Sequence, residues 1–141
     1  MSRSVTAFSP GHISGYFRKV SGSSPATTGS VGAGIVISEG VSATVGKADR
    51  TAITIFRSGA DGRAVRIADE SPPLRSALEE VGVDAAIATR CRLPIGAGFG
   101  LSAAALLAAL TAVDRLFGLG MGEREVAHIA HATEVRHSTG L

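Results

Sequence analysis

The sequence predicts an α+β fold, in which a mainly antiparallel sheet is covered by packed helices. Short β-prone segments fill most of the first half of the chain, and the strongest helical segments follow in the second half. The chain has 141 residues and is 45% hydrophobic, which is enough for one domain with a buried core. We therefore expect a single domain over residues 1–141, without an internal linker.

The composition narrows the possible classes of protein further. Eighteen glycines, one tyrosine and no tryptophan predict a core of small aliphatic side chains and several places where backbone must approach closely. The net charge of +2 is spread along the chain, which argues against nucleic-acid binding and against a polybasic membrane surface. The single cysteine, Cys91, cannot form an internal disulfide, so a cytoplasmic location is expected.

The first part of the chain predicts short strands separated by turns and one loop. Ser9, Pro10 and Gly11 are expected to turn the chain between the first two strands, and Glu39 with Gly40 to turn it again. Residues 21–34 are rich in Gly, Ser and Thr, which predicts a loop whose end fits closely against something else. The expected strands are residues 5–8, 13–20, 35–38, 41–45, 51–56 and 64–67.

The second part predicts three helices and one further strand. Pro72–Val81 has helical apolar spacing and is followed by Gly82 as a stop signal. Residues 84–93 alternate between apolar and polar side chains, which predicts a strand with Arg90 and Arg92 on its solvent side. Leu101–Phe117 is apolar nearly all round and should lie between other elements, and a last helix should begin near Glu123.

An uncharged run of 21 residues, 93–113, is long enough to cross a bilayer. Its first third contains Pro94 and three glycines, and its solid apolar part is shorter than a membrane helix requires. A buried core helix is therefore the better interpretation, and no membrane association is expected.

The most informative segment is LPIGAGFGLSAA, residues 93–104. Three alternate glycines lead from a predicted strand into a long helix with Ser102 in its first turn. Glycines let backbone approach a ligand, and the N–H groups and dipole at a helix start favour an anion, so the segment predicts a phosphate cradle. A tight turn with Ser102 as the helix N-cap explains the same residues equally well. The GxGxxG and Walker A patterns are absent, because Leu101 stands where the former needs glycine.

Residues 94–104, PIGAGFGLSAA, resemble the motif PxxxGLGSSAA of the GHMP kinase superfamily, which includes galactokinase, homoserine kinase, mevalonate kinase and phosphomevalonate kinase. Residues 8–15 (FSPGHISG), 29–34 (GSVGAG) and the ending from 132 to 141 are similar to the archaeal pantoate kinase branch of that superfamily. The resemblance spans nearly the whole chain. It implies the GHMP kinase N-terminal domain, with a ribosomal-protein-domain-2-like fold.

The resemblance implies an ATP-dependent kinase that phosphorylates the hydroxyl of pantoate to 4-phosphopantoate in coenzyme A biosynthesis, with ATP and Mg²⁺ as cofactors. The alternatives are another GHMP kinase, of the homoserine or mevalonate type, or a non-catalytic nucleotide-binding fragment. Pantoate and ATP are the expected partners, with neither nucleic acid nor membrane, and a homodimer is a further expectation. Family members are about twice as long, so we expect a C-terminal domain to be missing from this chain.

The resemblance also implies roles for particular residues. Ser102 and Glu134 would be the catalytic and metal-binding residues. Two positions depart from the family pattern, because Leu101 replaces the first motif serine and His12 stands where several relatives carry lysine. The residues expected to bind the nucleotide are Pro94, Gly96, Ala97, Gly98, Phe99, Gly100, Leu101, Ser102 and Ala103. Those expected to bind the substrate are His12, Gly29, Ser30 and Gly32.

Three histidines and Glu134 recur at every third position near the end of the chain, at 128, 131 and 137 beside 134. Each step of three turns the side chain back by about 60° around a helix, which separates His128 from Glu134. The spacing therefore favours a surface face over a metal cluster. Without the resemblance, Glu134 is expected to be a solvated helix residue.

Overall fold

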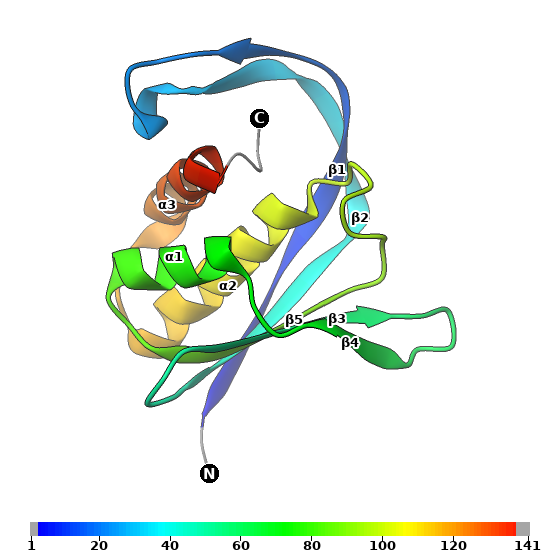
Figure 1. Cartoon of the computed structure of the whole chain (residues 1–141), viewed down its shortest axis with the longest axis vertical. Helices are drawn as coiled ribbons and strands as arrows, with labels where there is room; N and C mark the ends of the chain where they lie inside the picture. Colours follow the sequence, from blue (N-terminus) through cyan, green and yellow to red (C-terminus); the bar gives the residue numbers. More distant parts are fainter. Residues whose placement is uncertain (1–2, 138–141) are drawn as a thin grey trace.

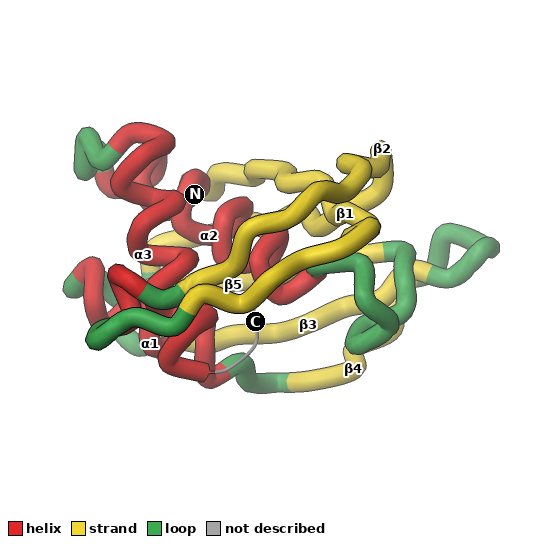
Figure 2. Tube along the Cα trace, turned by 90° about the horizontal axis from the view of Figure 1, so that it is seen from above, coloured by secondary structure: helices red, strands yellow, loops and turns green. Residues whose placement is uncertain are grey.

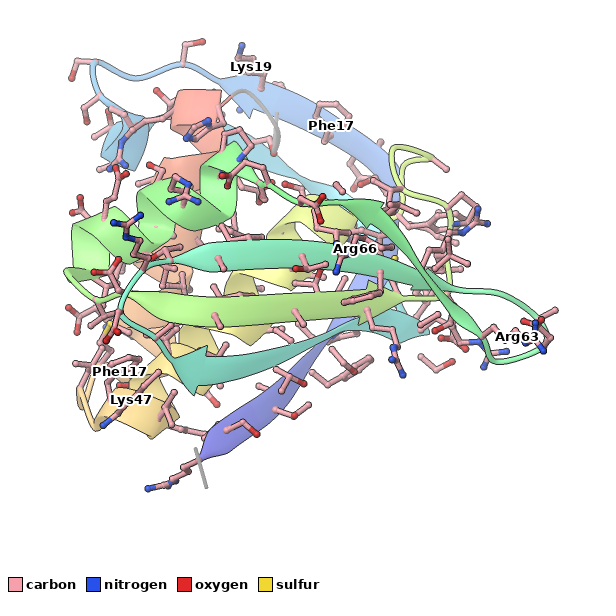
Figure 3. All side chains as sticks on the ribbon, turned by 60° about the horizontal axis from the view of Figure 1, so that its bottom comes forward. Phe17, Lys19, Lys47, Arg63, Arg66 and Phe117 are labelled. Carbon is pink, nitrogen blue, oxygen red and sulfur yellow. The ribbon has the colours of Figure 1, made fainter. Side chains whose placement is uncertain are left out.

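The computed structural model describes residues 3–137 as one sheet with its helices on one face (Figures 1 and 3). The sheet has five strands in the order β1-β2-β5-β3-β4, and every neighbouring pair is antiparallel except β3 and β5. The predicted α+β class is confirmed. The elements are β1 Ser4–Val20, the 3-10 turn η1 Pro25–Thr27, β2 Gly29–Lys47, β3 Ala52–Ser58, β4 Ala64–Ala68, α1 Pro72–Val81, β5 Ala85–Cys91, α2 Leu101–Phe117 and α3 Gly122–His137.

Helix α1 has the bounds that its end signals predict. The side chain of Ser71 accepts a hydrogen bond from the Leu74 N–H at 3.4 Å, and two prolines follow it in the first turn. Gly82 ends the helix in the left-handed conformation, with φ of 82°, and its N–H donates to the Leu78 carbonyl. The helix therefore begins and ends where side-chain chemistry closes its free backbone groups.

Helix α2 forms the centre of the core, as its apolar sequence predicts. Leu106, Leu110 and Val113 are completely buried, and they pack with the sheet residues Ala43 and Val45. The alternation along β2 and β5 places one face of each strand against the helices and leaves Arg90 of β5 exposed. The predicted strand ends earlier than expected, and Arg92 lies just beyond it. Among the described helices, none has the length and apolar character needed to cross a membrane.

Three turn or loop predictions in the first part of the chain are wrong. β1 continues through Pro10 and Gly11, opposite a bulge in β2, and β2 begins at Gly29 and continues through Gly40. The reason is the close approach of these two strands, since a Cβ on Gly32 or Gly40 would overlap the backbone of the opposite strand. The glycines serve strand pairing here and do not break the strands.

The two strands extend far beyond the rest of the sheet. β5 pairs only with residues 41–47 of β2, so residues 12–20 and 29–36 form a two-stranded ribbon, which we call the arm. The arm curves over the helices, and its tip comes down beside α3 (Figures 1 and 2). It exposes large apolar side chains, namely Ile13, Tyr16, Phe17, Val20, Val31, Ile35 and Val36.

Candidate functional site

The site is built around the segment that joins β5 to α2, residues 92–100, which we call the glycine loop. Gly96, Gly98 and Gly100 have φ angles of 80°, 89° and 66°, so all three occupy the left-handed region. L side chains are disfavoured there by roughly 1–2 kcal/mol per residue. The alternate glycines are therefore required by the path of the backbone, as the sequence indicates.

The start of α2 presents unused hydrogen-bond donors. Gly100 is the N-cap, and the Ala104 N–H donates to its carbonyl at 3.1 Å. Over residues 3–137, no hydrogen bond engages the N–H groups of Leu101, Ser102 and Ala103. These three donors lie at the positive end of the helix dipole, which makes the start of α2 suited to an anion.

Ser102 occupies the second helical position and not the N-cap, so the alternative of a simple Ser102-capped turn is wrong. The cap residue, Gly100, has no side chain with which to close the first turn. Ser102 is half-buried, and its hydroxyl makes no hydrogen bond within the described part of the chain. The hydroxyl is thus available to a ligand.

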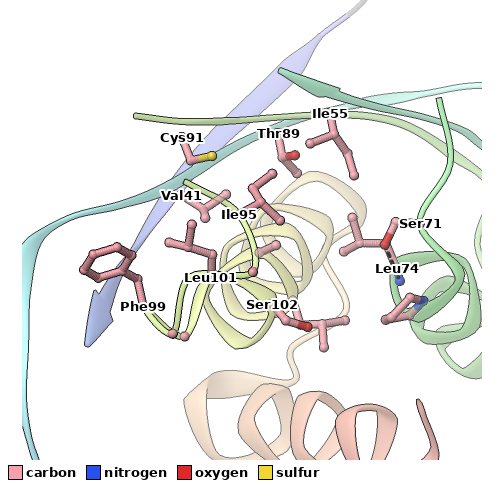
Figure 4. A pocket seen from close by; sticks show the side chains of 16 residues that line it. Val41, Ile55, Ser71, Leu74, Thr89, Cys91, Ile95, Phe99, Leu101 and Ser102 are labelled. Carbon is pink, nitrogen blue, oxygen red and sulfur yellow. Dashed lines mark hydrogen bonds between the residues drawn. The ribbon is translucent and has the colours of Figure 1, made fainter. Parts of the chain in front are cut away.

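A cavity of about 480 Å³ opens beside these donors (Figure 4). Its walls come from the glycine loop, the start of α2, the start of α1 and the helix-facing side of the sheet. Ile55, Ile95 and Leu74 give it an apolar lining, and the hydroxyl of Ser102 lies at its wall. The arrangement joins an apolar pocket to a row of N–H donors, which fits a ligand with a flat apolar part and an anionic part.

The sheet side of the cavity was not identified from the sequence. Thr89 and Cys91 face it from β5, and Ser71 faces it from the cap of α1. In the alternating segment 84–93, Thr89 and Cys91 lie on the side opposite Arg90, which is the covered face of the strand. This alternation is the sequence signal that could have identified them as cavity residues. Burial raises the pKa of the Cys91 thiol, and the positive charge of Arg57 opposes this only in part.

Glu134 is buried, with 9% of its surface exposed, so the expectation of a solvated residue is wrong. It continues the inward stripe of α3 formed by Val126, Ala130 and Thr133. The connection between α2 and α3 is short, and α3 runs back along α2 (Figure 1). Because both helices rise about 1.5 Å per residue, Glu134 and Ser102 belong to the same end of this helix pair.

The four residues expected to bind a substrate lie in two places. His12 contacts the glycine loop, because its N–H donates to the Phe99 carbonyl at 2.9 Å. Gly29, Ser30 and Gly32 lie on the arm, and Gly29 approaches His131 of α3. The structure thus brings His12 to the donors at the start of α2, whereas the arm glycines are brought to α3. The residues of the ending from 138 to 141 lie outside the described part of the chain.

The residues that could hold a metal ion offer hydroxyl and carboxylate oxygens. Ser102 lines the cavity, and Glu134 is a carboxylate on the inner face of α3. Hard oxygen ligands of this kind suit Mg²⁺, which commonly takes one or two protein oxygens and completes its shell with water and phosphate. Across residues 3–137, no group of three His, Cys, Asp or Glu side chains could hold a metal ion.

Comparison with known proteins is consistent with this geometry. The family model of the GHMP kinases N terminal domain matches residues 63–141. The chain belongs to the GHMP kinase family. The matched residues include the glycine loop, the start of α2 and Glu134, which are parts of the site described above.

Individual proteins are similar to part or to nearly all of the chain. The pantoate kinase of Methanospirillum hungatei is 48% identical over 137 residues, covering 97% of this chain and 47% of that protein. The mevalonate kinase of Pyrococcus horikoshii is 43% identical over 63 residues, covering 42% of this chain and 18% of that protein. The solved structure of a phosphotransferase related to the CoA biosynthesis pathway superposes with a TM-score of 0.76 at 27% identity, covering 99% of this chain and 48% of that one. The chain thus spans about half the length of the pantoate kinase that it matches.

Proposed function

We propose that this chain is the nucleotide-binding part of an ATP-dependent kinase that phosphorylates the hydroxyl of pantoate. One observation carries the proposal. Three alternate glycines with positive φ lead to three unengaged N–H donors at the start of α2, beside an apolar cavity. A nucleoside triphosphate has the two parts that this arrangement accommodates, a flat base and a chain of oxyanions.

In this proposal the base enters the cavity beside Ile55 and Leu74, and the phosphates lie against the start of α2. The donors of Leu101, Ser102 and Ala103 neutralise phosphate charge without having to reorganise, because the helix already holds them. The absence of side chains on the loop glycines lets the phosphates approach the backbone. Pro94, Ala97 and Phe99 complete the loop around the triphosphate.

Ser102 and Glu134 are the proposed Mg²⁺ ligands and catalytic residues. The hydroxyl of Ser102 and the carboxylate of Glu134 come from the facing ends of two antiparallel helices, and both are oxygen ligands. When bound, the ion would offset the charge that develops on the transferred phosphoryl group. The contribution of the chain is to hold the triphosphate and its ligating oxygens in a fixed arrangement.

Pantoate is proposed as the acceptor because the pantoate kinase of Methanospirillum hungatei aligns along 97% of this chain. His12 at the glycine loop and Gly29, Ser30 and Gly32 on the arm are the proposed acceptor-side residues. The product would be 4-phosphopantoate, an intermediate on the way to coenzyme A in the cytoplasm. A homodimer is part of the same proposal.

The test is ADP formation by the purified protein with ATP and Mg²⁺ against pantoate, homoserine and mevalonate. The proposal predicts turnover with pantoate and much less with the other two acceptors. Equal rates with all three, or preference for mevalonate, would assign the protein to another acceptor. Tight nucleotide binding without phosphoryl transfer to any acceptor would instead identify a non-catalytic nucleotide-binding module.

A further inference from the structure

Gly11 and His12 of β1 lie against the glycine loop, at a point where the ladder between β1 and β2 is irregular. In the register of β1 and β2, Pro10 pairs with Gly40 and His12 pairs with Val36. One residue of β1, Gly11, therefore stands opposite three residues of β2, and the ladder is interrupted there. The extra residues form a bulge in β2, which locally disrupts the ladder. Beside this bulge, the His12 N–H of β1 donates to the Phe99 carbonyl of the glycine loop.

Three contacts join Gly11 and His12 to the glycine loop. The His12 N–H donates to the Phe99 carbonyl at 2.9 Å. A Cβ on Gly11 would lie 2.7 Å from the same carbonyl oxygen, so the two backbones are as close as glycine allows. The imidazole of His12 fills the space that a Cβ on Gly100 would need. Residues 11–12 of β1 and residues 99–100 of the glycine loop are therefore closely packed against each other.

These contacts fix the peptide that precedes the N-cap of α2. The carbonyl and N–H of a trans peptide point in opposite directions, and the chain has no cis peptide among its described residues. Holding the Phe99 carbonyl on β1 therefore turns the Gly100 N–H away from β1. It also fixes the direction from which the chain enters the first turn of α2, where the donors of residues 101–103 begin.

We propose that Gly11 and His12 form a clamp that holds the glycine loop ready for a nucleotide, with His12 as a positioning residue. The inference rests on the proposed nucleotide site and adds a role for residues outside the loop. A loop with three glycines can adopt many backbone conformations when no ligand is bound. Binding must restrict the loop to one of them, and the conformational entropy lost in this way weakens affinity. The clamp restricts the loop before the nucleotide binds, so that less entropy is lost on binding, and it does so without contacting the nucleotide.

The test compares nucleotide affinity among variants of the chain by calorimetric titration with MgATP. Gly11→Ala forces a methyl group against the Phe99 carbonyl, and His12→Ala removes the ring that packs on Gly100. Each is expected to raise the Kd for MgATP about tenfold, as loss of preorganisation does. Gly46→Ala is the matched control, because it lies in the same strand pair and, of the described residues, its Cβ would meet only the Arg3 carbonyl, at 3.9 Å.

His12→Phe separates positioning from charge. The phenyl ring keeps a flat body against Gly100 but has no ring nitrogen that could be protonated or form a hydrogen bond, so positioning predicts a Kd near that of the wild type. A Kd as weak as that of His12→Ala would contradict positioning by the ring and indicate a direct polar contact with the nucleotide. Thermal unfolding of each variant shows whether the fold is retained, and His12→Phe tests the clamp even if Gly11→Ala does not fold.

Two further outcomes distinguish this inference from the proposed function. A wild-type chain that binds MgATP, with Gly11→Ala and His12→Ala variants that bind it equally well, would overturn the clamp alone. A folded wild-type chain that binds no nucleotide would overturn the proposed function and the clamp together.

Discussion

The Nε2 atom of His131 lies 2.6 Å from the carbonyl oxygen of Thr28 and joins α3 to the tip of the arm. A carbonyl oxygen only accepts hydrogen bonds, so Nε2 carries the proton in this contact. Gly29 follows Thr28, and a Cβ at that position would lie 3.1 Å from the His131 ring. The ring thus fixes the end of a two-stranded ribbon that would be only marginally stable alone.

We expect His131→Ala to release the tip of the arm. Loss of this hydrogen bond should lower the local stability of the arm by about 1 kcal/mol. Amide hydrogen exchange of residues 28–36, read by mass spectrometry, measures the change. His128→Ala is the control, because His128 is exposed on the same helix. Unchanged exchange in His131→Ala would show that other contacts hold the arm.

Alanine at Gly98 and at Gly100 should have different effects. Among the residues that the structure describes, none lies within 4 Å of a Cβ on Gly98, so its penalty is the left-handed backbone, roughly 1–2 kcal/mol. A Cβ on Gly100 meets the same penalty and also overlaps the ring of His12. Gly100→Ala should therefore be the less stable variant and the weaker binder of MgATP.

The control for these glycine variants is Gly82→Ala. Gly82 is also left-handed, with φ of 82°, and no residue of the described range 3–137 lies within 4 Å of a Cβ there. It ends α1 and is not among the residues that line the cavity. The Gly82→Ala variant should have a lower free energy of unfolding in urea and an unchanged affinity for MgATP. Equal loss of affinity in all three variants would show that the effect is global and not one of the glycine loop.

Ser102→Ala and Glu134→Gln should impair phosphoryl transfer more than nucleotide binding. Each removes one proposed oxygen ligand of Mg²⁺, so the rate should fall at least about 100-fold and require more Mg²⁺ to saturate. Initial rates of ADP formation across a Mg²⁺ series measure both effects. Ser23→Ala, on the exposed segment before η1, is the control. An unchanged Mg²⁺ dependence in both site variants would argue against their assignment as ligands.

Leu101→Ser restores the serine of the family motif, and it should destabilise the protein. Leu101 is 7% exposed and packs against Val41, Cys91 and Ala104. Removing a buried leucine side chain lowers the free energy of unfolding by about 2–5 kcal/mol, and a buried hydroxyl adds to this loss. Urea unfolding measures the change, and Leu119→Ser at a partly exposed position is the control. Unaltered stability would show that residue 101 is not part of the core.

The Cys91 thiol should react slowly with a maleimide at neutral pH. Burial raises its pKa, so the folded protein keeps the unreactive thiol form to a higher pH than the unfolded chain does. Because the thiol pKa is higher in the folded protein, Cys91 makes its full contribution to the free energy of unfolding below the ordinary thiol pKa. This contribution is lost as the pH rises through the raised pKa of the folded protein. MgATP should slow labelling further, because Cys91 lines the cavity. Labelling that MgATP leaves unchanged would place the nucleotide elsewhere, and labelling in urea serves as the unprotected control.

The elements whose limits are set by local signals could be predicted from the sequence. Pro72–Val81 and Leu101–Phe117 begin and end as expected, because capping and helical periodicity depend on nearby residues. The three glycines of the glycine loop also behave as expected, since their positive φ angles are a local property. For these residues the local sequence was sufficient to predict the structure.

The features that depend on distant partners could not be predicted in this way. Gly32 and Gly40 resemble strand breakers until the backbone of β1 is placed opposite them. Glu134 resembles a solvated residue until α3 is folded against α2, and the contact of His12 with Phe99 joins residues far apart in the sequence. In each case the deciding interaction is tertiary.

The most direct measurement of the central claim is an NMR titration of the isotope-labelled chain with MgADP. If the start of α2 binds the phosphates, the amide resonances of residues 96–103 should shift most, with those of the cavity wall beside them. Saturating MgADP that shifts other regions and leaves residues 96–103 unchanged would contradict the account.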